Sequence, residues 1–306
     1  MRNAFINTIV DACKIKDDIF IICGDAGLGV LDEFKNTYPG RFLNLGVAEQ
    51  NMASFSAGLA MTGFKIYIYN IIPFLLYRCY EQVRNDICYQ NLPLVLIGIG
   101  SGLTYAPAGL THYSVEDIGV AQTLPNLSII SPIDPIEAKA AALYSLGAEE
   151  PVYVRVAKSG EPLIHKKADI DITVPQIIRE GADIAIVFHG SIAVEVMAAY
   201  DILVREDIHP MLISVPMLQP LDKNTLLDIL KKIKFVISVE EHYYNTGLGA
   251  ILARIHSEFS PPWRLKTMGI PYKFIHEIKN TGGMRKHFKI SMDDIVKLAK
   301  ELMKGC

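Results

Sequence analysis

The sequence predicts an α/β protein made of two consecutive parallel-sheet domains. Short, continuously apolar runs rich in β-branched residues alternate with segments of helical periodicity, and this alternation stops once near the middle of the chain before it resumes. Continuous apolarity is typical of parallel strands, which helices cover on both faces. With 306 residues, of which 50% are hydrophobic, the chain is also long enough for two domains with substantial cores.

The first domain is expected to span residues 1–160. Its clearest helix opens with Asp134 as N-cap and Pro135 at the first helical position, and it closes at Gly147. The expected strands of this domain are residues 19–23, 65–70, 92–100, 127–132 and 151–156. Strands that alternate with helices in this way indicate βαβ units of one parallel sheet.

Residues 161–181 are predicted to be a linker, because they lose the alternation and gather charged residues, Gly and Pro. A second, smaller α/β domain is expected over residues 182–306. Its strands are predicted at residues 182–190, 209–216, 235–241 and 263–271, and its helices are predicted to begin near Ser191, Asp222, Gly247 and Met292.

Composition and charge argue against several classes of partner and site. A net charge of −3 supplies no general attraction for nucleic acid, so none is expected as a partner. The five cysteines are odd in number and lack C-x-x-C spacing, which indicates neither a disulfide framework nor a zinc site and favours a reducing, cytoplasmic setting. The longest apolar runs are about half of the ~20 residues that span a membrane, and no signal peptide is recognised, so neither a membrane partner nor export is expected.

One carboxylate stands where the pattern predicts burial. In "NLGVAEQNMASFSAGLAMTG", residues 44–63, Glu49 opens a helix whose neighbouring faces carry the small residues Ala53, Ser56 and Ala57. Such residues permit close packing against another helix, and a subunit interface is one candidate. Burial disfavours the charged form of Glu49 unless a ligand supplies a donor or shares its proton. The residues alone leave an alternative open, in which Glu49 only occupies a favourable helix N-terminus.

The motifs around this carboxylate resemble those of the transketolase family. "GVAEQNM" is similar to the family signature "GIAEQNM", "YNIIPFLLYRCYEQVRNDI" is similar to "TFxxFxxxRAxEQIRxxI", and "AGLTHYSVED" is similar to "DGPTHQxxED". "SIISPIDPIEA" and the later "VISVEEHYYNTGLG" resemble further segments of the same family. The motifs occur in the family's order and cover nearly the whole chain, so the resemblance implies its pyrimidine-binding and C-terminal domains.

The resemblance implies thiamine diphosphate as the cofactor. By this match, Glu49 hydrogen-bonds the pyrimidine nitrogen and stabilises the imino tautomer, Phe74 stacks on the pyrimidine ring, Tyr77 lies beside it, and Asp25 lies near the cofactor. An acid kept away from water would suit that role, and the cofactor supplies the electron sink. The alternatives are a plain helix core for Phe74 and Tyr77, and a turn-stabilising role for Asp25.

Two further residues match substrate-binding positions of the family. His112 matches a substrate-facing histidine that can move protons near neutral pH, and Arg155 matches an arginine that holds a sugar phosphate. The alternatives are a structural histidine and an ion pair at the domain junction. Two departures, Ala108 for an acid and Gly100 for a histidine, replace groups that contact sugar hydroxyls in transketolases. The resemblance therefore implies a changed substrate site.

One domain of a full-length transketolase has no counterpart in the matched motifs. That domain binds the diphosphate and its metal through a GDG motif and a later Asn pair, whereas Gly24-Asp25-Ala26 lacks the second glycine. The resemblance therefore implies the C-terminal subunit of a split enzyme. An N-terminal subunit would carry the GDG site and bind Mg²⁺ or Ca²⁺, and this chain would contribute no metal ligand. A dimer of this chain within a heterotetramer is expected.

The predicted activity is transfer of a two-carbon ketol or aldehyde unit to an aldehyde acceptor. The donor is expected to be a small molecule, either a ketose phosphate or a 2-oxo acid. Three alternatives stay open: a β-type subunit of a 2-oxo acid dehydrogenase, a subunit similar to deoxyxylulose phosphate synthase, and a non-catalytic partner subunit. The first would lie beside a lipoyl-dependent acyltransferase, whereas the split transketolase requires a separate GDG subunit.

Overall fold

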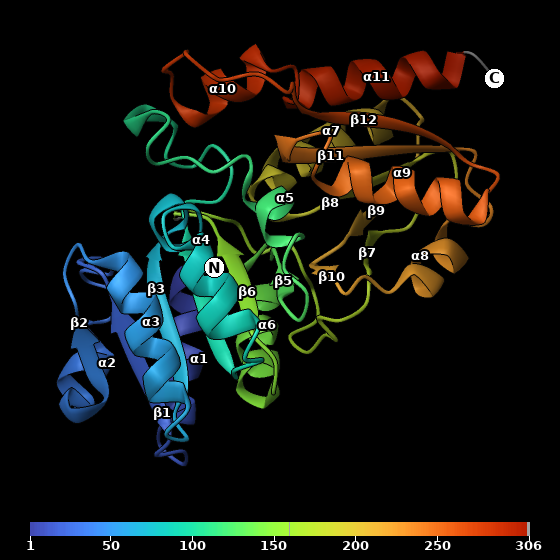
Figure 1. Ribbon diagram of the computed structural model, residues 1–306. Coiled ribbons are helices and arrows are strands. Elements are labelled where there is room, and N and C mark those ends of the chain that lie inside the picture. Colours follow the sequence, from blue (N-terminus) through green and yellow to red (C-terminus); the bar gives the residue numbers. More distant parts are fainter. Residues whose placement is uncertain (159, 305–306) are drawn as a thin grey trace.

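The computed structural model describes residues 1–158 and 160–304, which form two α/β domains with one sheet each (Figure 1). The first sheet has seven strands in the order β10-β5-β6-β4-β3-β1-β2. All of its neighbouring strands are parallel except β10, which pairs antiparallel with β5. Its strands are β1 (Ile19–Cys23), β2 (Phe42–Asn44), β3 (Lys65–Ile71), β4 (Leu94–Ile99), β5 (Ser128–Ile130), β6 (Val152–Val156) and β10 (Met217–Gln219).

Helices cover both faces of the first sheet, which explains the continuous apolarity of its strands. Alternate residues of β3 point to opposite faces, so Ile66 and Ile68 pack in one core cluster, and Tyr67 and Tyr69 pack in another. The first cluster includes the helix α3 (Glu49–Ala60), and the second includes α1 (Arg2–Ala12) and α6 (Pro135–Gly147). In Figure 1, α3 lies in front of this sheet and α1 lies behind it.

The second sheet has five strands in the order β12-β11-β8-β9-β7, of which only the edge strand β7 is antiparallel to its neighbour. Its strands are β7 (Gln176–Arg179), β8 (Ala185–Phe188), β9 (Met211–Ser214), β11 (Phe235–Tyr243) and β12 (Arg264–Ile270). The longer helices of this domain are α7 (Ala193–Arg205), α8 (Lys223–Leu230), α9 (Leu248–Phe259) and α11 (Met292–Lys304). The predicted fold class, two consecutive α/β domains, is confirmed.

Two strands depart from a simple division of the chain. The strand β7 lies within residues 161–181, and β10 lies in the second half of the chain but completes the edge of the first sheet. Beside β10, Ser131 donates its N–H to the carbonyl of Pro216, 2.8 Å away, which extends the contact between the two halves. We keep the division into residues 1–160, 161–181 and 182–306 as a proposal for the units that fold separately.

The helical segment after β3 contains two π-helical stretches. They are Pro73–Tyr77 and Val83–Cys88, and they flank the short helix α4 (Tyr80–Gln82). A π-turn inserts one extra residue into a helix and is frequent at functional sites, because it re-aims the side chains that follow. Phe74, Tyr77 and Arg78 lie at the first of these stretches, so helical periodicity alone would misplace them.

The structure also bears on metal binding and membrane insertion. Among residues 1–158 and 160–304, there is no group of three or more His, Cys, Asp or Glu side chains placed to hold a metal ion. Within the same residues, no helix is long and apolar enough to cross a membrane. Cys13, Cys23, Cys79 and Cys88 are buried free thiols, and Cys306 lies outside the described residues.

Asp134 links Ile164 and His165, in the segment after β6, to the N-terminus of α6 through hydrogen bonds. Its Oδ1 accepts hydrogen bonds from the N–H groups of Ile136 and Glu137, as the predicted N-cap requires. Its Oδ2 accepts hydrogen bonds from the N–H groups of Ile164 and His165, at 2.9 and 2.8 Å. Burial alone would raise the pKa of Asp134, but these bonds and the His165 ring outweigh burial and lower the pKa to about 2.

Asp134→Ala is expected to destabilise the chain by about 1–2 kcal/mol through the lost cap alone. Because the folded-state pKa lies below the unfolded value of 3.8, this contribution is present above pH 3.8 and is lost as the pH falls towards 2. Urea unfolding from pH 6 to pH 3 should therefore show a weaker loss of stability in the variant than in the wild type. Asp222→Ala, at the half-buried N-cap of α8, is the comparison for loss of a cap. The bonds with Thr225 also lower the pKa of Asp222, but Asp222 lacks the added bonds of Asp134 to Ile164 and His165, so its loss should change the acid dependence less. An equal acid dependence in Asp134→Ala and wild type would contradict this account.

Candidate active site

Glu49 opens α3 at the carboxyl edge of the first sheet and is almost fully buried. Only 2% of the residue is exposed, and its Oε2 lies 2.8 Å from Nη1 of Arg78. The turn before the helix is fixed by Asn44, whose side-chain oxygen accepts hydrogen bonds from the N–H groups of Asp25 and Gly46, each at 2.9 Å. The local fold therefore places a carboxylate out of water beside a cation that is itself half exposed.

The small residues of α3 pack against other elements of the same domain. Ala53, Ser56 and Ala57 are buried, and the helix packs against β3 and the helical segment Val83–Cys88. The exposed side of the same helix carries Phe55. The close helix packing predicted from the sequence thus occurs within the chain, while the role of this helix at a subunit interface stays a prediction.

Arg78, the ion-pair partner of Glu49, lines an open cavity of about 730 Å³. The walls of this cavity are mostly apolar, and they bring together several motifs that are separated in the sequence. The other lining residues include Phe74, Tyr77, Leu110 and Glu116. A largely apolar hollow with few polar groups is the usual form of a site for an organic cofactor or substrate. Phe74 and Tyr77, both predicted to contact the cofactor, face the same space.

Rings and cations form one continuous row along this site. The guanidinium of Arg78 lies over the ring of Phe74, with 4.3 Å from Cζ to the ring centroid. The ring centroid of Phe74 lies 5.5 Å from that of His112, and the ring centroid of Tyr105 lies 6.3 Å from that of His112. The ammonium of Lys158 lies 5.1 Å from the Tyr105 centroid. His112 therefore contacts two aromatic rings, one of which also carries the guanidinium of Arg78.

The position of the Tyr105 ring accounts for Gly100, one of the two departures from the family pattern. Gly100 has φ +92°, and any side chain there would collide with the ring of Tyr105. The missing side chain at position 100 therefore makes room for Tyr105 beside His112. Ala108, the other departure, is exposed on the loop between Tyr105 and His112. No local pattern pointed to Tyr105, because its position depends on a backbone conformation that only glycine adopts readily.

Glu116 is a polar group of the cavity that the sequence analysis did not single out. Its Oε2 accepts hydrogen bonds from the Tyr77 hydroxyl and from the N–H of Val115, both at 3.1 Å. Burial raises the pKa of Glu116 and raises that of Tyr77 well above its ordinary value. Glu116 also lines a second hollow, of about 360 Å³, beside Tyr243. Its place in the motif "AGLTHYSVED" was the available signal.

The loop that carries His112 is fixed by the second domain. Leu103 donates its N–H to Oε2 of Glu241 at 3.2 Å, and the hydroxyl of Tyr113 donates to the carbonyl of Ile275 at the same distance. His112 itself is restrained by Thr111, whose Oγ1 lies 2.8 Å from Nδ1. The position of His112 therefore depends on the contact between the two domains.

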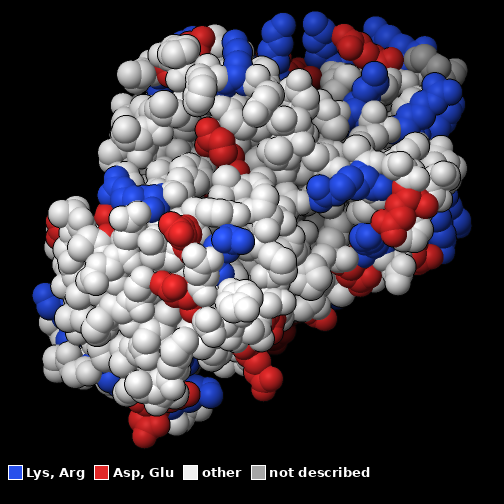
Figure 2. Space-filling view, in the orientation of Figure 1, with Lys and Arg blue, Asp and Glu red and all other residues white. Residues whose placement is uncertain are grey.

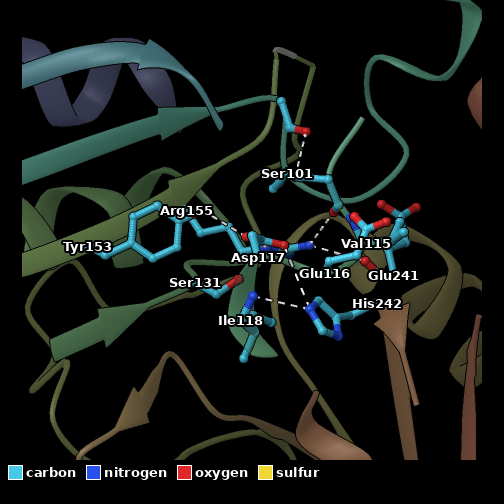
Figure 3. Close-up of polar contacts among 12 residues, drawn as sticks. Ser101, Val115, Glu116, Asp117, Ile118, Ser131, Tyr153, Arg155, Glu241 and His242 are labelled. Atoms are coloured by element: carbon cyan, nitrogen blue, oxygen red, sulfur yellow. Dashed lines mark hydrogen bonds and ion pairs between the residues drawn. The ribbon is translucent and has the colours of Figure 1, made fainter. Parts of the chain in front are cut away.

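Arg155 lies in a buried polar network between the domains rather than on the cavity wall (Figure 3). It is 1% exposed; its Nε donates to Oδ2 of Asp117 at 2.6 Å, and its Nη2 donates to the carbonyls of Ser114 and Glu241, both at 3.1 Å. The Tyr153 hydroxyl donates to the same carboxylate at 2.8 Å. This environment is the ion pair at the domain junction that the sequence left open, and a role for Arg155 in phosphate binding stays a prediction.

His242 completes the network from the second domain. Its Nε2 accepts the N–H of Ile118 at 3.1 Å, and its Nδ1 lies 3.0 Å from the carbonyl of Tyr243. These partners fit a neutral ring with the proton on Nδ1. Burial is the main cause that lowers the pKa of His242, which agrees with the neutral form.

Asp25 is not among the residues of the large cavity. It is exposed, with φ 52°, and lines a different hollow of about 330 Å³ together with Lys35 and Asn44. Its connection to Glu49 runs through the shared turn around Asn44. Asp25 takes part in this turn through its backbone N–H, whereas a turn-stabilising role of its side chain and its contact with a cofactor both stay predictions.

Charged side chains are unevenly distributed over the visible face of the molecule. In Figure 2, Lys and Arg gather mainly over the second domain, whereas the surface of the first domain is largely uncharged. The exposed large apolar side chains of the first domain include Val47, Phe55, Met61, Tyr89 and Leu110. Exposed large apolar side chains also occur on the second domain, for example Tyr244, Phe259 and Phe274, so they are not concentrated on one domain.

Comparison with known proteins identifies two family models that match successive parts of the chain. "Transketolase, pyrimidine binding domain" matches residues 1–161, and "Transketolase, C-terminal domain" matches residues 175–295. Two similar proteins are each named as one of the subunits of an apulose-4-phosphate transketolase. The protein of Actinobacillus succinogenes is 34% identical over 99% of this chain and 98% of its own, and that of Phocaeicola vulgatus is 29% identical over 99% and 97%.

A solved structure agrees with these sequence matches. A split-gene transketolase, described as an inactive beta4 tetramer, superposes with a TM-score of 0.88 at 25% identity. The superposition covers 99% of this chain and 97% of that one, so both domains and their relative arrangement are shared.

Proposed function

This chain belongs to the transketolase family, and we propose that it is the C-terminal subunit of a split transketolase that uses thiamine diphosphate. The observation that carries the proposal is the buried carboxylate of Glu49 beside an open apolar cavity with Phe74 at its wall. A planar heterocycle that needs one aromatic face and one buried acid fits those two groups. Both domain models and the relatives that match over the full chain support the same function.

The residues of this chain would hold the pyrimidine part of the cofactor. Phe74 would stack on the ring, Tyr77 would close its edge, and Glu49 would hydrogen-bond a ring nitrogen and keep the proton there. Thiamine diphosphate, when bound, supplies the electron sink for cleavage of a carbon–carbon bond next to a carbonyl. Exclusion of water around Glu49 by α3 and by the helical segment after β3 keeps this hydrogen bond strong.

His112 would act on the substrate. Thr111 engages Nδ1 of the imidazole, so we assign Nε2 to a substrate oxygen. The flanking rings of Phe74 and Tyr105 limit rotation of His112, which fixes the direction of that nitrogen. We propose a ketose phosphate as the donor, because two relatives are named for apulose 4-phosphate, and a 2-oxo acid as the alternative donor.

The remaining parts of the site would come from another subunit. An N-terminal subunit with the GDG motif would bind the diphosphate and Mg²⁺ or Ca²⁺, as the family resemblance implies. Figure 2 shows a largely uncharged face on the first domain, and exposed apolar side chains of this domain, including Phe55 and Tyr89, would be available to such a partner. We propose a dimer of this chain within a heterotetramer.

The test is reconstitution from separate parts. Turnover of a ketose phosphate in the presence of an aldehyde acceptor is expected only when this chain, the GDG subunit, thiamine diphosphate and Mg²⁺ are all present. Calorimetry of the chain alone with thiamine diphosphate and Mg²⁺ should show weak binding, because the diphosphate and metal contacts lie elsewhere. Tight binding by the chain alone, or equal turnover without the GDG subunit, would contradict the split arrangement.

A further inference from the structure

One arginine engages both groups that the proposed function assigns to the pyrimidine ring. The Nη1 of Arg78 lies 2.8 Å from Oε2 of Glu49, and the guanidinium carbon lies 4.3 Å from the centroid of Phe74. The Arg78 side chain is 47% exposed, whereas the Glu49 side chain is 2% exposed. A half-exposed cation therefore covers a buried acid and the face of an aromatic ring at the same time.

A guanidinium and an aminopyrimidine are similar in the features that these two groups recognise. Both are planar, both present N–H donors at the edge of a delocalised system, and both stack on aromatic faces. The face of Phe74 that Arg78 covers cannot hold two such planar groups at once, although the carboxylate of Glu49 can accept more than one hydrogen bond. Any ring that takes this place must displace the side chain.

We propose that Arg78 occupies the ring site of the free chain and swings out towards solvent when the pyrimidine ring enters. The identity of the ring rests on the function proposed above, whereas the occupancy of the site rests on the contacts of Arg78 alone. The backbone at this position is held in place, because the carbonyl of Arg78 accepts a hydrogen bond from Nε2 of Gln50 at 3.2 Å. The exchange therefore needs rotation of one side chain and no refolding.

The arrangement has a physical purpose in a subunit that is made separately from its partner. A buried carboxylate without a partner is costly, and Arg78 pairs with Glu49 until the ring arrives. The same pairing lowers the apparent affinity for the ring, because only chains with Arg78 displaced can bind it. Ring binding and release of Arg78 are thus two sides of one equilibrium.

The rise in melting temperature caused by a bound pyrimidine tests the proposal, and it requires no partner subunit, no diphosphate and no turnover. Arg78→Ala opens the site, so 4-amino-2-methylpyrimidine at millimolar concentration should raise the melting temperature of this variant, as a ligand of the folded state does. The wild type should need about tenfold more of the same probe for an equal rise. Arg84→Ala is the matched control, because Arg84 is an exposed arginine of the same helical segment whose Nη1 contacts Asn85. Glu49→Gln combined with Arg78→Ala should abolish the rise in melting temperature that the probe causes.

Arg78→Lys covers the case in which Arg78→Ala does not fold, because it keeps a positive charge near Glu49 but lacks the planar fork of the guanidinium. The probe concentration that raises the melting temperature of Arg78→Lys should lie between those for Arg78→Ala and for the wild type. Equal responses of wild type and Arg78 variants, or a weaker response of the variants, would overturn the proposal. If the variants respond as expected but the reconstituted enzyme does not depend on thiamine diphosphate, the proposed function fails and the occupancy by Arg78 stands.

Discussion

Replacement of Glu49 by glutamine is expected to lower the turnover of the reconstituted enzyme by about 10²–10⁴-fold, which is the range for removal of a group that transfers a proton. Glutamine has the shape of glutamate and fits the same buried space, but its amide neither takes up nor gives up a proton near neutral pH. The loss should appear in kcat, because the change affects what the site does to the bound cofactor rather than whether the substrate enters.

The measurement compares kcat of the Glu49→Gln complex with that of wild type, while sedimentation checks that both assemble with the GDG subunit. Glu81→Gln is a suitable control, since Glu81 is an exposed carboxylate of the neighbouring helical segment. Assembly should be unchanged in both variants. Full turnover in Glu49→Gln would leave Glu49 with a helix-end role only and would remove the main support for the proposed function.

Much of the fold followed from local signals in the sequence. The strands β1 and β6 begin and end close to where their apolar runs do, and α6 begins at the predicted cap, because Asp134 and Pro135 determine that start through hydrogen bonds within a few residues. The short strands β2, β7 and β10 were missed. They have only three, four and three residues, and each exists because a neighbouring strand offers unpaired backbone groups. Pairing of that kind is not encoded in local periodicity.

Some residues of the candidate site could likewise be predicted from local motifs, whereas others could not. Glu49, Phe74 and His112 could be predicted from motifs, and the structure brings the ring centroids of Phe74 and His112 to 5.5 Å and joins Glu49 to Phe74 through Arg78. Arg78 was not singled out, although it matches the Arg of the motif "TFxxFxxxRAxEQIRxxI", and Tyr105 lies in none of the quoted motifs. The position of Arg78 depends on π-turns in the helical segment, and that of Tyr105 depends on the positive φ of Gly100. The contacts of both side chains follow from backbone geometry, although the presence of an arginine at position 78 could be predicted from the motif.

Arg155→Met is expected to destabilise the chain by about 3–5 kcal/mol, because it removes one partner of a buried ion pair and leaves the other uncompensated. Asp117 is fully buried, and without Arg155 its remaining hydrogen bond from a neighbouring side chain would be that of the Tyr153 hydroxyl. Tyr153→Phe should cost less, about 1–2 kcal/mol, since it removes a neutral donor. Urea unfolding of both variants, monitored by circular dichroism, measures the difference.

The double variant Arg155→Met with Asp117→Asn separates two explanations of this residue. If Arg155 serves as the ion pair that joins the domains, removal of the charge on Asp117 should restore part of the stability lost in Arg155→Met, because no unpaired buried charge remains. If Arg155 instead serves mainly to hold a substrate phosphate, Arg155→Met should keep its stability and raise KM of the reconstituted enzyme. The hydrogen bonds from Arg155 to Ser114 in one domain and Glu241 in the other favour the first outcome, since both are made without any ligand.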